Sequence, residues 1–188
     1  TEVHPAHGVP VNRLSVLAAF GGNFQGDVAV ETGLKCADDG FQIAADLGAK
    51  NDVISLADTM VWSVPPRIER VVGAVHERWP DVTIALHLHD TRGIAIANAH
   101  TALKMGVARF DTTVGGLGGC PFAAHKGAAG NICTEELVML CEEMGIATGV
   151  DLDKLIEVGR MAEAMVGHTL PSELVHAGSL NAFRSASA

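Results

Sequence analysis

The sequence predicts an α/β fold with parallel strands, and two observations support this prediction. Short apolar segments bounded by Gly, Asp or Asn alternate with longer segments whose apolar residues recur at helical spacing. The chain has 188 residues, of which 48% are hydrophobic and 19% charged, so it can bury a sizeable core. Because a helix follows each strand, successive strands are expected to lie parallel and to be joined by right-handed crossovers.

The elements follow in order along the chain. Strands are expected at residues 14–20, 52–56, 82–87 and 108–114. Helices are expected at residues 31–48, 65–79, 93–105, 134–144 and 151–166. Pro65 is typical of a helix start and Gly106 of a helix end. The tail, residues 171–188, is expected to be loosely ordered.

Four strand–helix units fit either an open doubly wound sheet or half of an eight-stranded barrel, whose complete form typically needs ~250 residues. The residues that follow the strands favour the barrel. Polar or Gly-rich segments stand at every strand end, at residues 21–23, 57–59, 87–90 and 115–120. Active residues of (β/α)8 barrels gather at this rim. The sequence therefore predicts part of a single (β/α)8 TIM-barrel domain, with about four βα units and additional C-terminal helices.

Charge and cysteine content exclude several classes of partner. The net charge is -9 and basic runs are absent, which argues against nucleic acid and anionic membrane surfaces. No apolar segment reaches 18 residues, so no membrane span is expected. The cysteines lack paired spacing. We therefore expect reduced thiols and a soluble compartment; the bacterial cytoplasm is the first expectation and the mitochondrial matrix the alternative.

His87 and His89 close the apolar strand at residues 82–87. Side chains alternate along a strand, so the two imidazoles face the same way, roughly 6–7 Å apart along the backbone. A single histidine at a strand end is more often a hydrogen-bonded rim or core residue. Two of them, at i and i+2 on the rim of a barrel, indicate a site for one metal ion.

Three motifs occur in order along the chain, namely HLHDTRG at residues 87–93, DTTVGGLGGCPF at residues 111–122 and GN at residues 130–131. In this order they closely resemble the C-terminal half of 3-hydroxy-3-methylglutaryl-CoA (HMG-CoA) lyases. The resemblance extends over most of the chain, through residues 55–59, 134–137 and 145–152. It implies a metal-dependent TIM-barrel lyase that splits an HMG-CoA-type thioester into acetyl-CoA and acetoacetate, as in leucine degradation and ketone-body formation.

The resemblance also implies a metal site. His87 and His89 match the two metal-binding imidazoles of the family, and Asn131 matches its amide-oxygen ligand. Mg²⁺ or Mn²⁺ is the expected ion, because mixed His, Asn and carboxylate ligation allows either. The family further implies a part for His87 in proton transfer, although an imidazole that binds a metal cannot act freely as a base.

Other residues match the catalytic part of the family. Cys120 matches an essential loop cysteine, whose thiol can protonate a carbanion. Gly116, Gly118 and Gly119 give the preceding loop the freedom to close over an acyl-CoA substrate. Asp58 matches an acidic residue near the metal and the substrate, but an aspartate that caps a loop or a helix is an equally good interpretation.

The sequence departs from the family pattern in three places. Residues 121–130 form a segment two residues longer than in common members, so substrate preference can differ. Residues 18–26 replace a segment that often carries a Cys-Pro pair. No strand with an Arg-Asp-Gly motif precedes Val11, although this motif supplies a carboxylate ligand and an arginine.

From these departures we expect residues 1–188 to be the C-terminal portion of one barrel domain, completed by an upstream segment or a second chain. A homo-oligomer is expected, and the chain alone should be weakly active or inactive. Claisen synthases and metal aldolases also carry H-x-H on a barrel strand, but they lack the loop that contains Cys120. An inactive partial-barrel fragment is the non-enzymatic alternative.

Overall fold

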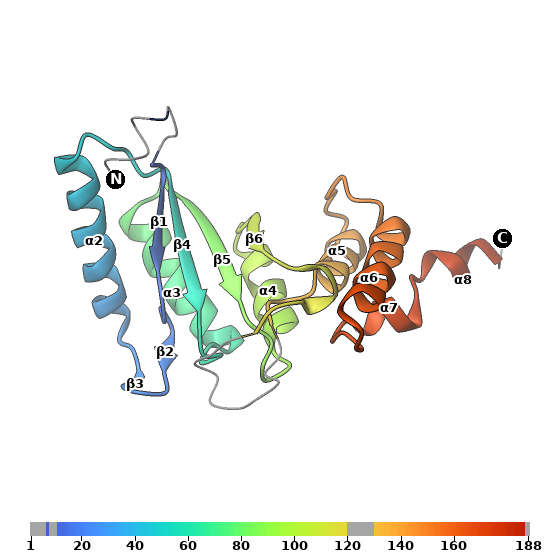
Figure 1. The fold of residues 1–188 in the computed structure, drawn as a ribbon. Helices are drawn as coiled ribbons and strands as arrows, with labels where there is room; N and C mark the ends of the chain where they lie inside the picture. Colours follow the sequence, from blue (N-terminus) through green and yellow to red (C-terminus); the bar gives the residue numbers. More distant parts are fainter. Residues whose placement is uncertain (1–6, 8–10, 120–129, 187–188) are drawn as a thin grey trace.

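The computed structural model describes residues 7, 11–119 and 130–186 (Figure 1). Its main sheet has four strands, all parallel, in the order β1-β4-β5-β6. The strands are β1 (Arg13–Val16), β4 (Val53–Asp58), β5 (Thr83–Leu88) and β6 (Arg109–Asp111). The helices α2 (Val30–Asp46), α3 (Pro65–Arg78) and α4 (Ala95–Lys104) connect consecutive strands. The α/β fold with parallel strands is therefore present as expected.

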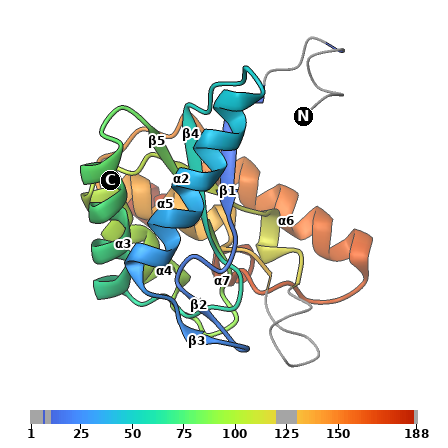
Figure 2. The same ribbon diagram turned by 90° about the vertical axis from the view of Figure 1, so that its left-hand side faces the viewer.

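Helices cover one face of the sheet, and the turned view in Figure 2 places α3 to one side of β1. Apolar residues of alternate strand positions point to this face and join the helices in one core, including Ile54, Leu86, Leu88, Ile68 and Val72. These side chains are fully buried, with 0% exposure each. Each such residue stabilises the fold by about 1.5–3 kcal/mol relative to an exposed position.

The other face of the sheet is polar and partly open. Arg13 and Ser15 of β1 and Arg109 of β6 are exposed there, while the central positions are small residues such as Ser55 and Ala85. The alternation follows from the register, because Ser15, Ser55 and Ala85 are paired neighbours across the sheet. A parallel sheet with helices on one face and polar side chains on the other has the layering of part of a barrel.

Two strand ends differ from the expectation. The first strand stops at Val16 because Ala18 adopts a φ of 50° and Leu17 turns outward with 72% exposure. A two-stranded antiparallel ribbon follows, formed by β2 (Gly21–Gly22) and β3 (Gly26–Asp27). The last strand stops at Asp111, and the 3-10 helix η1 (Val114–Gly116) begins shortly after it.

The C-terminal helices extend beyond the β6 edge of the sheet (Figure 1). They are α5 (Thr134–Glu143), α6 (Leu152–Val166), α7 (Glu173–Ala177) and α8 (Asn181–Ala186). Asp151 caps α6 by accepting a hydrogen bond from the Lys154 backbone N–H. Within the described ranges, no helix is long and apolar enough to cross a membrane.

The expectation of a loosely ordered tail from Pro171 is wrong for its first part. Ser172 is fully buried, caps α7 through the Val175 N–H and donates a hydrogen bond to Glu136 of α5. Leu174 and Val175 of α7 are also buried. The hydrogen bond between Ser172 and Glu136, 36 positions apart, therefore fixes α7 against α5. Local composition does not predict such a long-range contact.

Candidate metal and active site

The two histidines meet at the carboxyl end of β5. Their Nε2 atoms lie 3.3 Å apart, and the rings stand at 78° to each other. His89 Nδ1 lies 3.0 Å from the Thr59 carbonyl oxygen, and His87 Nδ1 lies 3.3 Å from Asp111 Oδ2. Both partners are oxygen acceptors, so a hydrogen on each Nδ1 would satisfy them and would leave the Nε2 lone pairs of the two rings directed toward each other. Two converging lone pairs suit a shared cation.

Asn131 joins this pair through the backbone. It forms an isolated antiparallel bridge with His89, and the adjacent Ile132 N–H donates to the Leu88 carbonyl at 2.9 Å. The Asn131 Oδ1 atom is buried and has no hydrogen-bond partner. An unpaired buried amide oxygen costs about 1–3 kcal/mol, so this atom is poised to accept a ligand.

These donors fit the expected ion. Two imidazole nitrogens and an amide oxygen provide the mixed donor set that allows Mn²⁺ or Mg²⁺. Among the residues with described positions, no group of three or more His, Cys, Asp or Glu side chains has the arrangement to hold a metal ion by itself. The described part of the chain therefore supplies His87, His89 and Asn131 as candidate ligands, while the Asp111 carboxylate contacts His87 at Nδ1 and not at Nε2.

A tight crossing of two backbone segments holds Asn131 in place. A Cβ atom on Gly130 would lie 2.6 Å from the Leu117 carbonyl oxygen and 2.7 Å from that of Gly116. The neighbouring Gly115 has a φ of 61°, and its N–H donates to both carboxylate oxygens of Glu135 at 2.9 and 3.0 Å. Only glycine can occupy the crossing without a shift of the backbone.

Glu135 was not identified as a site residue from the sequence, where it counts only as part of a helix start. Its side chain is fully buried, and burial raises its pKa. The carboxylate fastens the η1 turn to α5 and so anchors the start of the glycine-rich segment. The sequence shows only that Glu135 lies in the first turn of a helix after the GN motif. This pattern does not identify the Gly115 N–H as its partner.

Asp58 does not lie beside the imidazoles. Its register partner is Leu88, so its side chain lies on the helix-covered face, opposite to that of His87. The fully buried carboxylate accepts hydrogen bonds from the Trp62 N–H at 2.8 Å and from the Ser63 N–H at 3.1 Å, and it also contacts Ser63 Oγ. The catalytic interpretation of Asp58 therefore gives way to the loop-capping alternative.

The turn that Asp58 closes has a function in the site, because it presents the Thr59 carbonyl to His89. Asp58→Asn should lower the free energy of unfolding by about 1–3 kcal/mol, since the amide nitrogen cannot accept these hydrogen bonds. Urea unfolding of the variant and the wild type measures this difference. Unchanged stability together with lost activity would restore the catalytic interpretation.

The residues of the expected substrate loop are only partly described. Cys120 lies outside the described residues. Gly118 and Gly119 are exposed, but Gly116 is buried, with a φ of 71°, and a Cβ atom there would lie 2.6 Å from Cys133 Sγ. Gly116 is therefore a packed position, in contrast to the exposed Gly118 and Gly119.

The two buried cysteines are poor candidates for the reactive thiol. Burial, reinforced by Glu136, raises the pKa of the Cys133 thiol far above its usual range. Burial also raises the pKa of Cys141. Because reactive cysteines have lowered pKa values, both thiols are structural.

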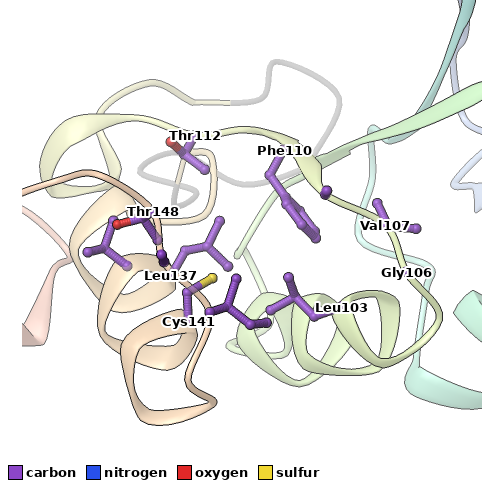
Figure 3. Close-up of a pocket in the computed structure, with 12 residues that line it drawn as sticks. Leu103, Gly106, Val107, Phe110, Thr112, Leu137, Cys141 and Thr148 are labelled. Carbon is purple, nitrogen blue, oxygen red and sulfur yellow. The ribbon is translucent and has the colours of Figure 1, made fainter.

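A separate apolar pocket of about 430 Å³ lies outside the sheet, between α4 and α5 (Figure 3). Leu103, Phe110, Leu137 and Cys141 line it, and Phe110 extends into it from β6. It contains neither of the two histidines nor Asn131. With an apolar lining and an unreactive thiol, this pocket is not the candidate site.

The sequence profile of the HMGL-like family matches residues 25–162. Hydroxymethylglutaryl-CoA lyase YngG of Bacillus subtilis is 39% identical over 160 residues, which are 85% of this chain and 51% of that protein. The (R)-citramalyl-CoA lyase of Chloroflexus aurantiacus is 41% identical over 165 residues, 88% of this chain and 50% of that protein. The chain thus spans about half the length of these relatives.

A solved structure agrees with the sequence relatives. The HMG-CoA lyase of Acinetobacter baumannii, in complex with coenzyme A and 3-methylmalate, superposes with a TM-score of 0.76 at 40% identity. The match covers 88% of this chain and 52% of that one.

Proposed function

Because this chain belongs to the HMGL-like family, we propose that it provides the metal-binding half of a lyase that cleaves an HMG-CoA-type thioester to acetyl-CoA and acetoacetate. The observation that carries the proposal is the convergence of His87 and His89 at 3.3 Å beside the unpartnered Asn131 Oδ1. The acyl-CoA substrate is supported by the two relatives described above, both of which are named for CoA thioesters.

His87, His89 and Asn131 would hold the divalent ion, Mg²⁺ or Mn²⁺. When bound, the ion supplies a positive charge that lowers the pKa of the substrate hydroxyl and stabilises the developing carbonyl. The Nε2 atoms of both histidines would be available to the ion, because their Nδ1 atoms contact Asp111 and the Thr59 carbonyl. His87 would therefore serve as a ligand, and the base that removes the hydroxyl proton would be another group.

The cleavage reaction requires one base, which removes a proton, and one acid, which returns one. The substrate hydroxyl loses its proton, the carbon–carbon bond breaks, and its electron pair stays on the acetyl-CoA carbon as an enolate. The Cys120 thiol then returns a proton to that carbon. Gly118 and Gly119, which precede Cys120 in the sequence, are exposed, and a Cβ atom on Gly118 would lie 3.6 Å from Asn131 Nδ2.

A carboxylate ligand would come from the remainder of the barrel, because the Asp111 carboxylate contacts His87 at Nδ1 and not at the Nε2 atom that faces His89. The test is therefore a chimera in which this chain is joined to the part of the Bacillus subtilis relative that it does not match. We expect this chimera to release acetyl-CoA from HMG-CoA when Mg²⁺ or Mn²⁺ is present and to stop in EDTA. Turnover that persists in excess EDTA, or a folded chimera that binds Mn²⁺ without turnover, would contradict the proposal.

A second candidate substrate has specific support. The citramalyl-CoA lyase is 41% identical to this chain, slightly more than the HMG-CoA lyase YngG. The same chimera, assayed with citramalyl-CoA and HMG-CoA in parallel, ranks the two substrates by kcat/KM. A higher value for citramalyl-CoA would assign the second activity.

A further inference from the structure

A network of polar side chains connects all four strands on the open face of the sheet. Arg13 of β1 reaches over the sheet and binds both carboxylate oxygens of Asp111 on β6, with Nη1 to Oδ1 at 3.2 Å. Its Nη2 also donates to Ser55 Oγ on β4 at 2.7 Å. Asp111 lies beside His87 of β5 in the register, and its Oδ2 is 3.3 Å from His87 Nδ1.

We propose that Asp111, aimed by Arg13, is a positioning residue that holds the hydrogen of His87 on Nδ1 and turns its Nε2 atom toward the metal position. This inference rests on the proposed metal site. Histidines that bind metals usually donate their other N–H to a carboxylate or a backbone carbonyl, which fixes both tautomer and ring orientation.

The two histidines differ in how this N–H is fixed. His89 donates to the backbone carbonyl of Thr59, which a side-chain substitution leaves in place. His87 depends on the carboxylate of Asp111. Without Asp111 the ring of His87 could rotate or adopt the other tautomer, and one of the two imidazole donors would no longer face the ion.

Because the Arg13–Asp111 ion pair is exposed, its effect on the orientation of His87 can be distinguished from an effect on the stability of the fold. The side chains of Arg13 and Asp111 are 40% and 37% exposed. Ion pairs this accessible to solvent contribute about 0–1 kcal/mol to folding. The loss of a hydrogen-bond partner behind a metal ligand typically reduces metal affinity 10–100-fold. A substitution of Asp111 should therefore change metal binding much more than stability.

The first experiment measures Mn²⁺ binding to the 188-residue chain by electron paramagnetic resonance. We expect Asp111→Ala to raise the Kd for Mn²⁺ by about 10–100-fold. Asp111→Asn should recover most of the affinity, because its amide oxygen can still accept the Nδ1 hydrogen. Asp39→Ala, which removes an exposed carboxylate of α2, serves as the matched control and should bind Mn²⁺ like the wild type.

The second experiment needs no metal. Long-range ¹H–¹⁵N NMR of the metal-free chain reports which nitrogen of His87 carries the hydrogen, and we expect Nδ1–H in the wild type and a mixture in Asp111→Ala. An unchanged tautomer together with unchanged Mn²⁺ affinity in Asp111→Ala would overturn the positioning role. A wild type that binds no Mn²⁺ but shows the tautomer shift would overturn the proposed metal site and leave the orientation by Asp111 standing.

Discussion

Replacing His89 with alanine should weaken Mn²⁺ binding by at least about 100-fold, which exceeds the usual effect of losing a residue behind a ligand. The substitution removes one of the two Nε2 atoms that meet at 3.3 Å, so the described residues keep only one imidazole and the amide oxygen of Asn131. In the completed barrel, lyase turnover should fall with the metal. Titration of Mn²⁺ followed by electron paramagnetic resonance checks the affinity, and acetyl-CoA release checks the turnover.

A matched control separates this effect from a general loss of histidine. His100 is exposed on α4, and His100→Ala should bind Mn²⁺ with the wild-type Kd. The stability of His89→Ala should fall by only about 1 kcal/mol, because one hydrogen bond to the Thr59 carbonyl is lost. Wild-type metal content in a folded His89→Ala variant would exclude the assigned site.

Local patterns in the sequence predict much of this site. The alternation of a strand is sufficient to put His87 and His89 on one face, and the structure has both side chains there. The family resemblance and the partial-barrel fold are both confirmed by membership in the HMGL-like family and by the solved HMG-CoA lyases. The order of the helices and strands also follows from hydrophobic periodicity, because one face of each helix packs on the sheet.

Contacts between distant residues account for what the sequence did not predict. Arg13 and Asp111 are 98 positions apart, so their pairing depends on the curvature of the whole sheet. The family resemblance predicted Asp58 near the metal and the substrate, yet its register with Leu88 puts its side chain on the helix-covered face. A shift of one position in strand register turns a residue to the other face of the sheet. Local composition does not determine this register.

The crossing of two backbone segments at Gly130 should be the most sensitive point of the scaffold. Gly130→Ala would place a Cβ atom 2.6 Å from the Leu117 carbonyl oxygen and 2.7 Å from the Gly116 carbonyl oxygen. Both are backbone atoms, so relief requires a shift of the chain, which typically costs about 1–3 kcal/mol. The shift would also move Asn131, and with it the buried oxygen beside His89.

The variant should therefore lose both stability in urea and affinity for Mn²⁺. Gly33→Ala is the matched control, because a Cβ atom at this position of α2 would meet nothing within 4 Å. In a helix interior that change should stabilise the protein by about 0.5–1 kcal/mol and leave Mn²⁺ binding unchanged. If Gly130→Ala matched the wild type in both measurements, the backbone crossing would not be what positions Asn131 at the metal site.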